Sequence, residues 1–340
     1  MKKILVVFTG GTISCKTAGA VMSATAGVPY VLIRQYLRET GEDSFFTTAS
    51  PLTILSENLV PDDWKTMADC IRKTITPDTA GVIVTHGTDT LAYTAAALSF
   101  MLEGLPVPVV LTASDRPPDD ERSNAAANFA AAVEFIRGER LPGVYVIFRQ
   151  NGELPVFLGT RLCQAALYTH RFASVTGEPL GWMVEGCFHP QPHRSNPTVE
   201  ELRAVPEHPL PVFPDLRGCI QYIRPYPGMD YKRLSLPGSV RAVFHGLYHS
   251  GTACVRDGLS AFVESCRGEG REVFAAPVWF SEAEYASVRV IRDSGIRLLP
   301  PMAEEAAYVK LLLAYTLFPD DEEARREYLE RNVAFERLSG

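Results

Sequence analysis

Residues 81–102 read GVIVTHGTDTLAYTAAALSFML, and this stretch decides the fold. The apolar run Gly81–Val84 has the length and composition of a buried strand. A polar run over residues 85–90 follows it, and Thr90–Leu102 is rich in Ala and Leu, as helices are. The stretch therefore predicts a strand, a polar loop and a helix in succession.

The same alternation extends over the first half of the chain. Further strands are expected at Ile4–Phe8, Val107–Leu111 and Val144–Phe148. Further helices are expected at Asp62–Arg72, after a proline, and at Arg122–Arg137, where apolar residues recur at helical spacing. Strands alternating with helices predict an α/β fold, with a parallel sheet covered by helices on both faces.

The length and the proline distribution predict two domains. A chain of 340 residues exceeds the size at which one hydrophobic core usually stops growing. Prolines gather in Pro190–Pro214, which predicts a linker over residues 190–214 between a larger domain, 1–189, and a smaller one, 215–340. The smaller domain is expected to contain strands at Val240–Phe244, Val273–Pro277 and Arg297–Leu299 and a helix at Glu304–Thr316.

Composition excludes several classes of partner. The formal net charge is -7 and no basic block stands out, so neither nucleic acid nor an anionic membrane is expected to bind. The seven cysteines are scattered and never spaced as C-x-x-C, which argues against a zinc site and a disulfide framework. No apolar run approaches the length of a membrane span or a signal peptide, so the expected location is the cytoplasm.

Two polar loops are candidates for chemistry. TGGT at residues 9–12 follows the first strand, where glycines allow a tight turn with exposed N–H groups and a Thr hydroxyl could act as a nucleophile. THGTDT at residues 85–90 follows the strand Gly81–Val84, and Asp89 could bind a substrate ammonium. In the alternative interpretation, each Thr or Asp merely caps the next helix.

A third loop, Ser56-Glu57-Asn58, follows the apolar run Leu52–Leu55, which is interpreted as another strand. Its hydroxyl and carboxylate would suit the α-carboxylate and α-ammonium of an amino acid. A solvated turn is the alternative interpretation. Because ligands of open α/β sheets bind at the carboxyl ends of strands, all three loops should lie at one edge.

Read together, these loops resemble the bacterial-type L-asparaginases, a family that includes glutaminase-asparaginases and the D subunit of glutamyl-tRNA amidotransferase. The resemblance rests on FTGGTI at 8–13, VTHGTDTLAYTAAALSFML at 84–102 and the DRP…N pattern at Asp115–Asn128. It implies a larger N-terminal flavodoxin-like domain and a smaller C-terminal α/β domain. It also implies homodimers or homotetramers, with neither metal nor organic cofactor.

The resemblance further assigns roles to residues of this chain. Thr12 would attack the amide carbon, Thr88 would be the second threonine, and Asp89 would hold the substrate ammonium. Ser56 would hold the α-carboxylate, and Glu57 would occupy the amine-binding place. Gly11 and Gly87, which flank these groups, are also expected to contact substrate.

Three positions depart from the family pattern. Relatives have a catalytic Lys a few residues after the Arg of a G-x-R segment, whereas here Gln164 or Ala165 takes that place after Arg161. Relatives offer a Tyr in the loop after TGGT, where this chain has none before Tyr30. Asn124 stands where relatives usually have Asp.

Because of these departures, the sequence does not identify the residue that accepts the proton from the nucleophile. Lys16, in the expected loop after TGGT, or a histidine could serve as base, or water could be relayed through Gln164. His86 is expected instead to hold the HGTDT turn, and His245 and His249 are expected to have packing or surface roles.

The expected function is hydrolysis of L-asparagine, or a close amide such as glutamine, to the acid and ammonia. The alternative is a weakly catalytic or non-catalytic amino-acid-binding protein on the same fold. A tRNA-linked amidotransferase subunit is disfavoured, because the chain starts at its first strand and no basic surface is evident.

Overall fold

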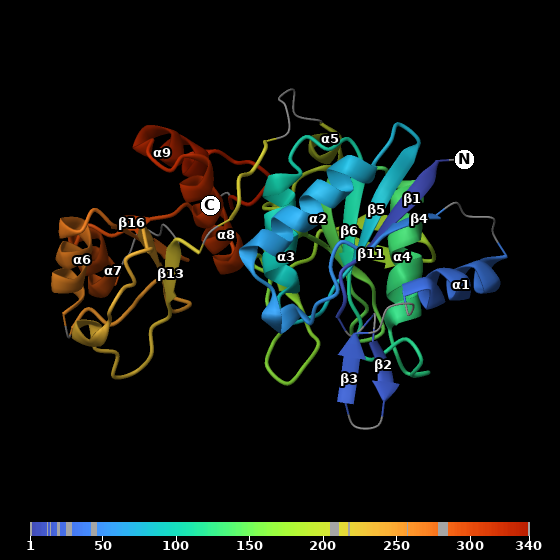
Figure 1. Ribbon diagram of the computed structural model, residues 1–340, viewed down its shortest axis with the longest axis horizontal. Coiled ribbons are helices and arrows are strands. Elements are labelled where there is room, and N and C mark those ends of the chain that lie inside the picture. Colours follow the sequence, from blue (N-terminus) through green and yellow to red (C-terminus); the bar gives the residue numbers. More distant parts are fainter. Residues whose placement is uncertain are drawn as a thin grey trace. The chain divides into compact units, whose positions relative to one another are not determined.

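The computed structural model describes residues 2–11, 13, 15–18, 21–24, 29–41, 46–204, 211–216, 218–256, 258–277 and 285–338. The chain divides into two compact units, Met1–Val212 and Phe213–Gly340 (Figure 1). The expected linker over residues 190–214, with domains on either side of it, stays a prediction. Pro190 itself ends a strand of the first unit, β12 (Cys187–Pro190).

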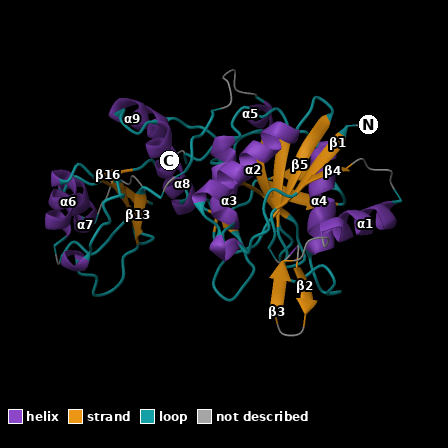
Figure 2. Ribbon diagram, in the orientation of Figure 1, coloured by secondary structure: helices purple, strands orange, loops and turns teal. Residues whose placement is uncertain are grey.

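The first unit is built on one large sheet, of which β1, β4 and β5 are labelled in Figure 2. Its strand order is β12-β11-β8-β7-β6-β5-β1-β4. The strands from β4 to β7 are parallel, and β8, β11 and β12 extend the sheet in antiparallel fashion. The strands are β1 (Lys3–Phe8), β4 (Phe46–Ala49), β5 (Thr79–Thr85), β6 (Pro108–Thr112), β7 (Gly143–Ile147), β8 (Pro155–Leu158) and β11 (Gly181–Val184).

The longer helices of this unit form two packed pairs, α1 with α4 and α2 with α3. They are α1 (Pro29–Thr40), α2 (Pro61–Thr74), α3 (Leu91–Met101) and α4 (Ala125–Gly138). The smaller elements are a hairpin, β2 (Cys15–Ala18) with β3 (Val21–Ala24), the 3-10 turns η2 (Ser56–Asn58) and η3 (Gly159–Arg161), β9 (Leu162–Cys163), β10 (Ala173–Ser174) and α5 (Val199–Arg203).

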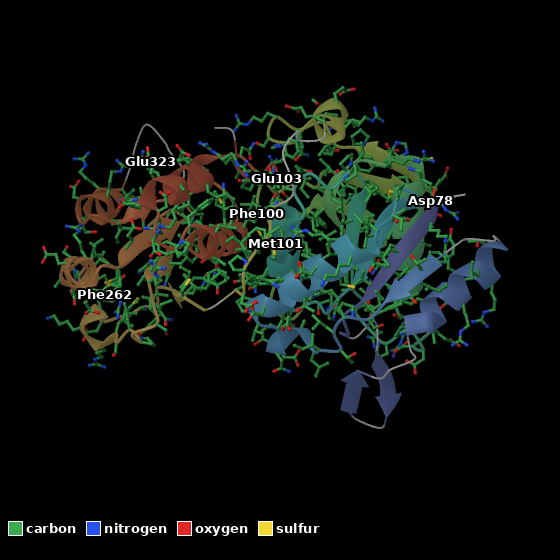
Figure 3. The ribbon with its side chains drawn as sticks, turned by 45° about the horizontal axis from the view of Figure 1, so that its top comes forward. Asp78, Phe100, Met101, Glu103, Phe262 and Glu323 are labelled. Carbon is green, nitrogen blue, oxygen red and sulfur yellow. The ribbon has the colours of Figure 1, made fainter. Side chains whose placement is uncertain are left out.

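Burial explains why β5 and α3 occupy the centre of this unit. Every residue of β5 is buried, as its continuous apolar run predicts for a strand inside a parallel sheet. Helix α3 is apolar almost all round, so it cannot lie on a wet surface. Its Phe100 and Met101 are fully buried (Figure 3). The loop between β5 and α3 is therefore held at both ends by the core.

One predicted strand is wrong. The run Leu52–Leu55 is not a strand; the strand that pairs with β1 is β4, Phe46–Ala49. Only Ile54 continues the pairing, through an isolated bridge to Gly10. Thr47 and Thr48 make β4 too polar to stand out as an apolar run, and an edge strand does not need one.

The second unit has a smaller parallel sheet in the order β13-β14-β15-β16. Its strands are β13 (Ile220–Ile223), β14 (Ala242–Gly246), β15 (Glu272–Ala276) and β16 (Arg297–Leu298). Its helical segments are η4 (Tyr231–Arg233), α6 (Leu259–Gly268), α7 (Ala286–Asp293), α8 (Glu304–Leu317) and α9 (Glu322–Glu330). The α/β fold predicted from the sequence is thus confirmed in both units.

A buried ion pair fixes the segment after α9. The Lys310 ammonium, on α8, donates to Glu336 at 2.6 Å and to the carbonyl oxygens of Leu329 and Arg331. Both charged side chains are fully buried. Glu336 also accepts the N–H groups of Val333 and Ala334, so each buried charge is satisfied.

Within the described residues, no helix is long and apolar enough to cross a membrane.

Candidate functional site

The strand order of the first unit predicts where a ligand would bind. In chain order the parallel strands β4-β1-β5-β6-β7 follow the pattern 2-1-3-4-5, whose direction reverses between β1 and β5. Ligands of such sheets bind at the carboxyl ends of the two strands at this switch point. TGGT follows β1 and THGTDT follows β5, so both candidate loops begin at that point.

The loop after β1 is hydrogen-bonded to the segment after β4. Gly11 N–H donates to Ile54 O at 3.0 Å, and Ile54 N–H donates to Thr9 O at 3.0 Å. Gly10 and Gly11 have φ angles of 107° and 74°, in the region that favours glycine. Thr12 lies outside the described residues, so its predicted role stays a prediction.

Three of the predicted site residues meet at this edge. A Cβ added to Gly11 would lie 2.6 Å from Gly87 Cα, and one added to Gly87 would lie 2.7 Å from Ser56 Cβ. Side chains at the two glycines would therefore collide with the neighbouring loop. Ser56 is buried, with 4% of its surface exposed. The structure thus brings Gly11, Ser56 and Gly87 together from three loops.

Two threonine hydroxyls tie these loops to one another. Thr9 Oγ1 donates to Thr85 O at 2.7 Å, joining the ends of β1 and β5. Thr90 Oγ1 donates to Ser56 O at 2.9 Å, joining the loop after β5 to η2. Thr90 was assigned no role from the sequence, although it ends the THGTDT motif.

The capping interpretation of Thr88 and Asp89 is wrong. The N-cap of α3 is Thr90, and its side chain makes no capping hydrogen bond. Thr88 is partly exposed and Asp89 is exposed. In the part of the chain that the structure describes, neither side chain has a hydrogen-bond partner. Glu57, on η2, is exposed as well.

His86 holds the THGTDT turn from inside the protein, as expected from the sequence. Its side chain is 1% exposed. Nδ1 lies 2.8 Å from Gly87 O, and Nε2 lies 3.0 Å from Thr94 Oγ1. Burial lowers the pKa of His86 from 6.5 to about 4, so the imidazole is neutral near pH 7 and poorly suited to act as a base there.

The structure gives a reason for Asn124. Its Oδ1 accepts the Asp115 N–H at 3.0 Å, and its Nδ2 donates to Arg149 O at 2.9 Å. A carboxylate could not make the second bond. The side chain of Asp115 accepts the Asn124 N–H in return, at 3.1 Å. Asn124 therefore joins the loops that follow β6 and β7.

The place of the missing Lys lies after η3 and β9. Gln164 is exposed and Ala165 is partly buried. Arg161 is buried and donates to Ser195 O. Lys16, expected in a loop, lies in strand β2 opposite Ser23.

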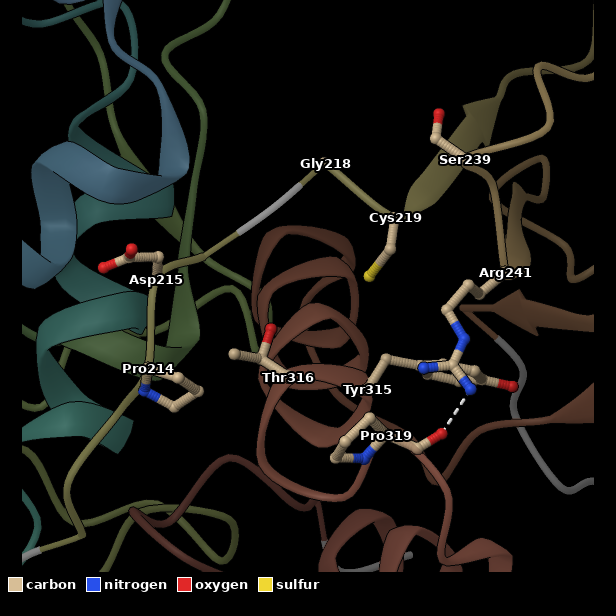
Figure 4. Close-up of a pocket in the computed structure, with 9 residues that line it drawn as sticks. All are labelled: Pro214, Asp215, Gly218, Cys219, Ser239, Arg241, Tyr315, Thr316 and Pro319. Atoms are coloured by element: carbon tan, nitrogen blue, oxygen red, sulfur yellow. Dashed lines mark hydrogen bonds between the residues drawn. The ribbon is translucent and has the colours of Figure 1, made fainter.

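Described residues of the second unit line at least two cavities. One, of about 600 Å³, is lined by Cys219 and Arg241, which directly precede β13 and β14, and by the end of α8 (Figure 4). It lies at the amino edge of this sheet, where Arg241 donates to Pro319 O. The other, of about 520 Å³, lies at the carboxyl edge and is lined by Tyr226, Tyr248, Ser250, Thr252 and Tyr285, among others.

No group of three or more His, Cys, Asp or Glu side chains among the described residues is arranged to hold a metal ion.

Comparison with known proteins identifies the family. Residues 3–193 match the family model described as "Asparaginase, N-terminal". The chain belongs to the asparaginase family. It is 29% identical to an L-asparaginase of Thermococcus kodakarensis, with 98% of each chain covered. It is also 29% identical to the D subunit of a glutamyl-tRNA(Gln) amidotransferase of Methanopyrus kandleri, covering 99% of this chain and 75% of that protein.

Solved structures of this family share the fold. The thermostable L-asparaginase from Thermococcus kodakarensis superposes with a TM-score of 0.78 at 26% identity, covering 99% of this chain and all of that one. L-asparaginase I from Vibrio cholerae superposes with a TM-score of 0.80 at 24% identity, covering 99% of both chains. The family recognised from the loops is confirmed, and the chain is an asparaginase-family amidohydrolase.

Proposed function

We propose that the chain hydrolyses the side-chain amide of free L-asparagine, or a close relative such as L-glutamine, with Thr12 as nucleophile. The observation that carries this proposal is the meeting of Gly11, Ser56 and Gly87 at the switch point of the sheet. Amide hydrolysis requires a nucleophile, an oxyanion site and groups that hold the amino acid. The loops that contain these three residues supply candidates for each.

Each loop of the site is assigned a role in this reaction. Thr12 attacks the amide carbon and Thr88 acts as the second threonine, while Ser56 binds the α-carboxylate. Asp89 and Glu57 pair with the α-ammonium, because a charge-assisted hydrogen bond offsets the loss of solvation on binding. No metal or organic cofactor takes part in this scheme.

Ammonia release from a panel of amides tests the proposal. Wild-type protein should release ammonia from asparagine, Thr12→Ala should release none, and Thr12→Ser should retain part of the rate because it keeps a hydroxyl. The assay should use high enzyme concentration across pH 6–9. Wild-type release no greater than that of Thr12→Ala would reject the amidase.

The absence of the family's catalytic Lys favours one alternative function, that of an amino-acid-binding protein with little or no turnover. Gln164 or Ala165 stands where relatives have Lys, and loss of a positioned base typically costs ~10²–10⁴ in rate. Gln164→Lys and Ala165→Lys should each be assayed. A faster variant would identify the missing Lys as the rate limit, whereas aspartate binding without ammonia release in every variant would favour the binder.

We also propose that the active form is at least a homodimer, located in the cytoplasm. Ser250 and Thr252 line the tyrosine-lined cavity at the carboxyl edge of the second sheet, and we infer that this segment completes the site of a neighbouring subunit. Light scattering should give at least twice the 37.4 kDa chain mass. A fully active monomer would contradict this assembly.

A further inference from the structure

His86 lies in a chain of hydrogen bonds whose direction can be assigned. Gly87 O can only accept, so His86 Nδ1, 2.8 Å away, carries the proton. Nε2 of the neutral ring is then an acceptor for the hydroxyl of Thr94, at 3.0 Å. Thr94 Oγ1 in turn accepts Trp64 Nε1–H, which can only donate, at 3.0 Å. Every bond thus runs from Trp64 through Thr94 and His86 to Gly87 O.

This chain fixes the orientation of one peptide group. In a trans peptide the C=O of one residue and the N–H of the next point in opposite directions. Holding Gly87 O toward the buried imidazole therefore turns the Thr88 N–H away from the interior. Among the described residues, that N–H has no hydrogen-bond partner.

The second sheet contains a similar turn, in which a buried histidine is bonded to the carbonyl oxygen of the next glycine, but the N–H that follows is paired. His86 directly follows β5 and His245 is the last residue but one of β14, but the ring of His245 is bonded in the same way, with Nδ1 2.6 Å from Gly246 O and Nε2 2.8 Å from the hydroxyl of Tyr231. There, however, the following N–H, that of Leu247, donates to Ala276 O at 2.8 Å. The turn at His245 thus serves the sheet, whereas the turn at His86 leaves the Thr88 N–H without a partner among the described residues.

We propose that His86, locked as the Nδ1–H tautomer by Thr94 and Trp64, is a positioning residue that aims the Thr88 N–H at the oxyanion of the reacting amide. It touches neither substrate nor the reacting atoms, and acts only through the peptide between Gly87 and Thr88. The inference rests on the proposed amidase function. Preorganised N–H donors act mainly on the transition state. Loss of the correct orientation should therefore lower kcat and leave substrate affinity almost unchanged.

A matched pair of variants tests the inference. Asn places an amide N–H near the position of Nδ1, whereas Gln places its amide near Nε2. His86→Asn can still donate to Gly87 O, and its kcat should stay within about threefold of wild type. His86→Gln reaches Thr94 but not Gly87 O, and its kcat should fall by roughly 10²-fold, the typical loss for one oxyanion donor. Aspartate affinity, measured by calorimetry, should change little in both.

Controls separate positioning from folding. Thr94→Ser keeps the hydroxyl that fixes the tautomer and should retain kcat, whereas Thr94→Val should lower it. The corresponding His245→Asn and His245→Gln variants should alter stability without separating in kcat. If the His86 variants fail to fold, Trp64→Phe replaces them. It removes the indole N–H and keeps a smaller aromatic ring, and an unchanged kcat would count against the inference.

The possible failures can be told apart. A wild-type protein without amidase activity contradicts the proposed function. An active wild type whose His86→Asn and His86→Gln variants have equal kcat contradicts the positioning role alone. Nitrogen-15 NMR of histidine-labelled protein reads the tautomer without any turnover, and a bare Nδ1 in His86 at pH 7 would overturn the inference in every case.

Discussion

The hydroxyl of Thr90 donates a 2.9 Å hydrogen bond to the carbonyl oxygen of Ser56, so the cap residue of α3 holds the turn that carries the predicted carboxylate-binding serine. Thr90→Val should leave Ser56 O with only the longer bond from Leu59 N–H, at 3.2 Å, and loosen η2. We expect aspartate affinity to fall by about 1 kcal/mol, the usual worth of a neutral hydrogen bond. Thr90→Ser, which keeps the donor, is the control in the same calorimetric titration, and equal affinities in both variants would show that the tether does not matter.

Asp89 is expected to carry much of the binding energy for the α-ammonium. Asp89→Asn keeps the shape of the side chain and removes its charge, so aspartate should bind about tenfold or more weakly. Asp78→Asn makes the same change at an exposed residue directly before β5, at the opposite edge of the sheet, and should bind normally. Similar affinity in the two variants would remove Asp89 from the site.

The hydrogen bonds of Asn124 predict that restoring the usual family residue is harmful here. In Asn124→Asp a carboxylate oxygen would face Arg149 O, and the donor at 2.9 Å would be lost. Urea unfolding at pH 7 should show a loss of about 1–3 kcal/mol. Asn151→Asp, the same chemical change at an exposed residue, should have almost no effect. A fully stable Asn124→Asp would contradict this account.

The buried histidine predicts a pH dependence of stability. His86 has a pKa of about 4 in the folded chain and 6.5 as its ordinary value, so the unfolded state binds more protons between those values. The free energy of unfolding should therefore fall on acidification, by on the order of 2 kcal/mol between pH 7 and pH 5. Burial also lowers the pKa of His245, which adds to the effect.

Urea titrations of wild type and His86→Gln at both pH values, at one protein concentration, would measure this difference. The variant should lose less stability on acidification than wild type, because it lacks the buried titrating group. Parallel losses in the two proteins would assign the acid sensitivity to other groups.

The sequence predicted the central strands well because they are continuous apolar runs, such as β5, that end in polar loops. It missed β4 and the short antiparallel strands β8, β11 and β12, where pairing is set by neighbours rather than by composition. The meeting of the three loops was predictable because carboxyl ends of parallel strands share an edge.

The hydrogen bonds that hold the loops of the site in place were harder to predict from the sequence. The turn-holding role of His86 was predicted, but its tautomer depends on Trp64 and Thr94, which lie on two different helices. The bond from Thr90 to Ser56 likewise joins elements far apart in the chain. Such contacts are tertiary, and no local pattern of residue types encodes them.

The contact between Gly11 and Gly87 also limits how this protein can change over generations. A side chain at Gly11 would need the space of Gly87, and a side chain at Gly87 would need the space of Ser56, so neither position can accept a larger residue while the neighbouring loop keeps its place. A saturation library should therefore recover almost only glycine at both sites, even under selection for folding alone. Diversification of substrate range would have to arise elsewhere, at positions such as Glu57 and Gln164, whose exposed side chains leave room for replacement.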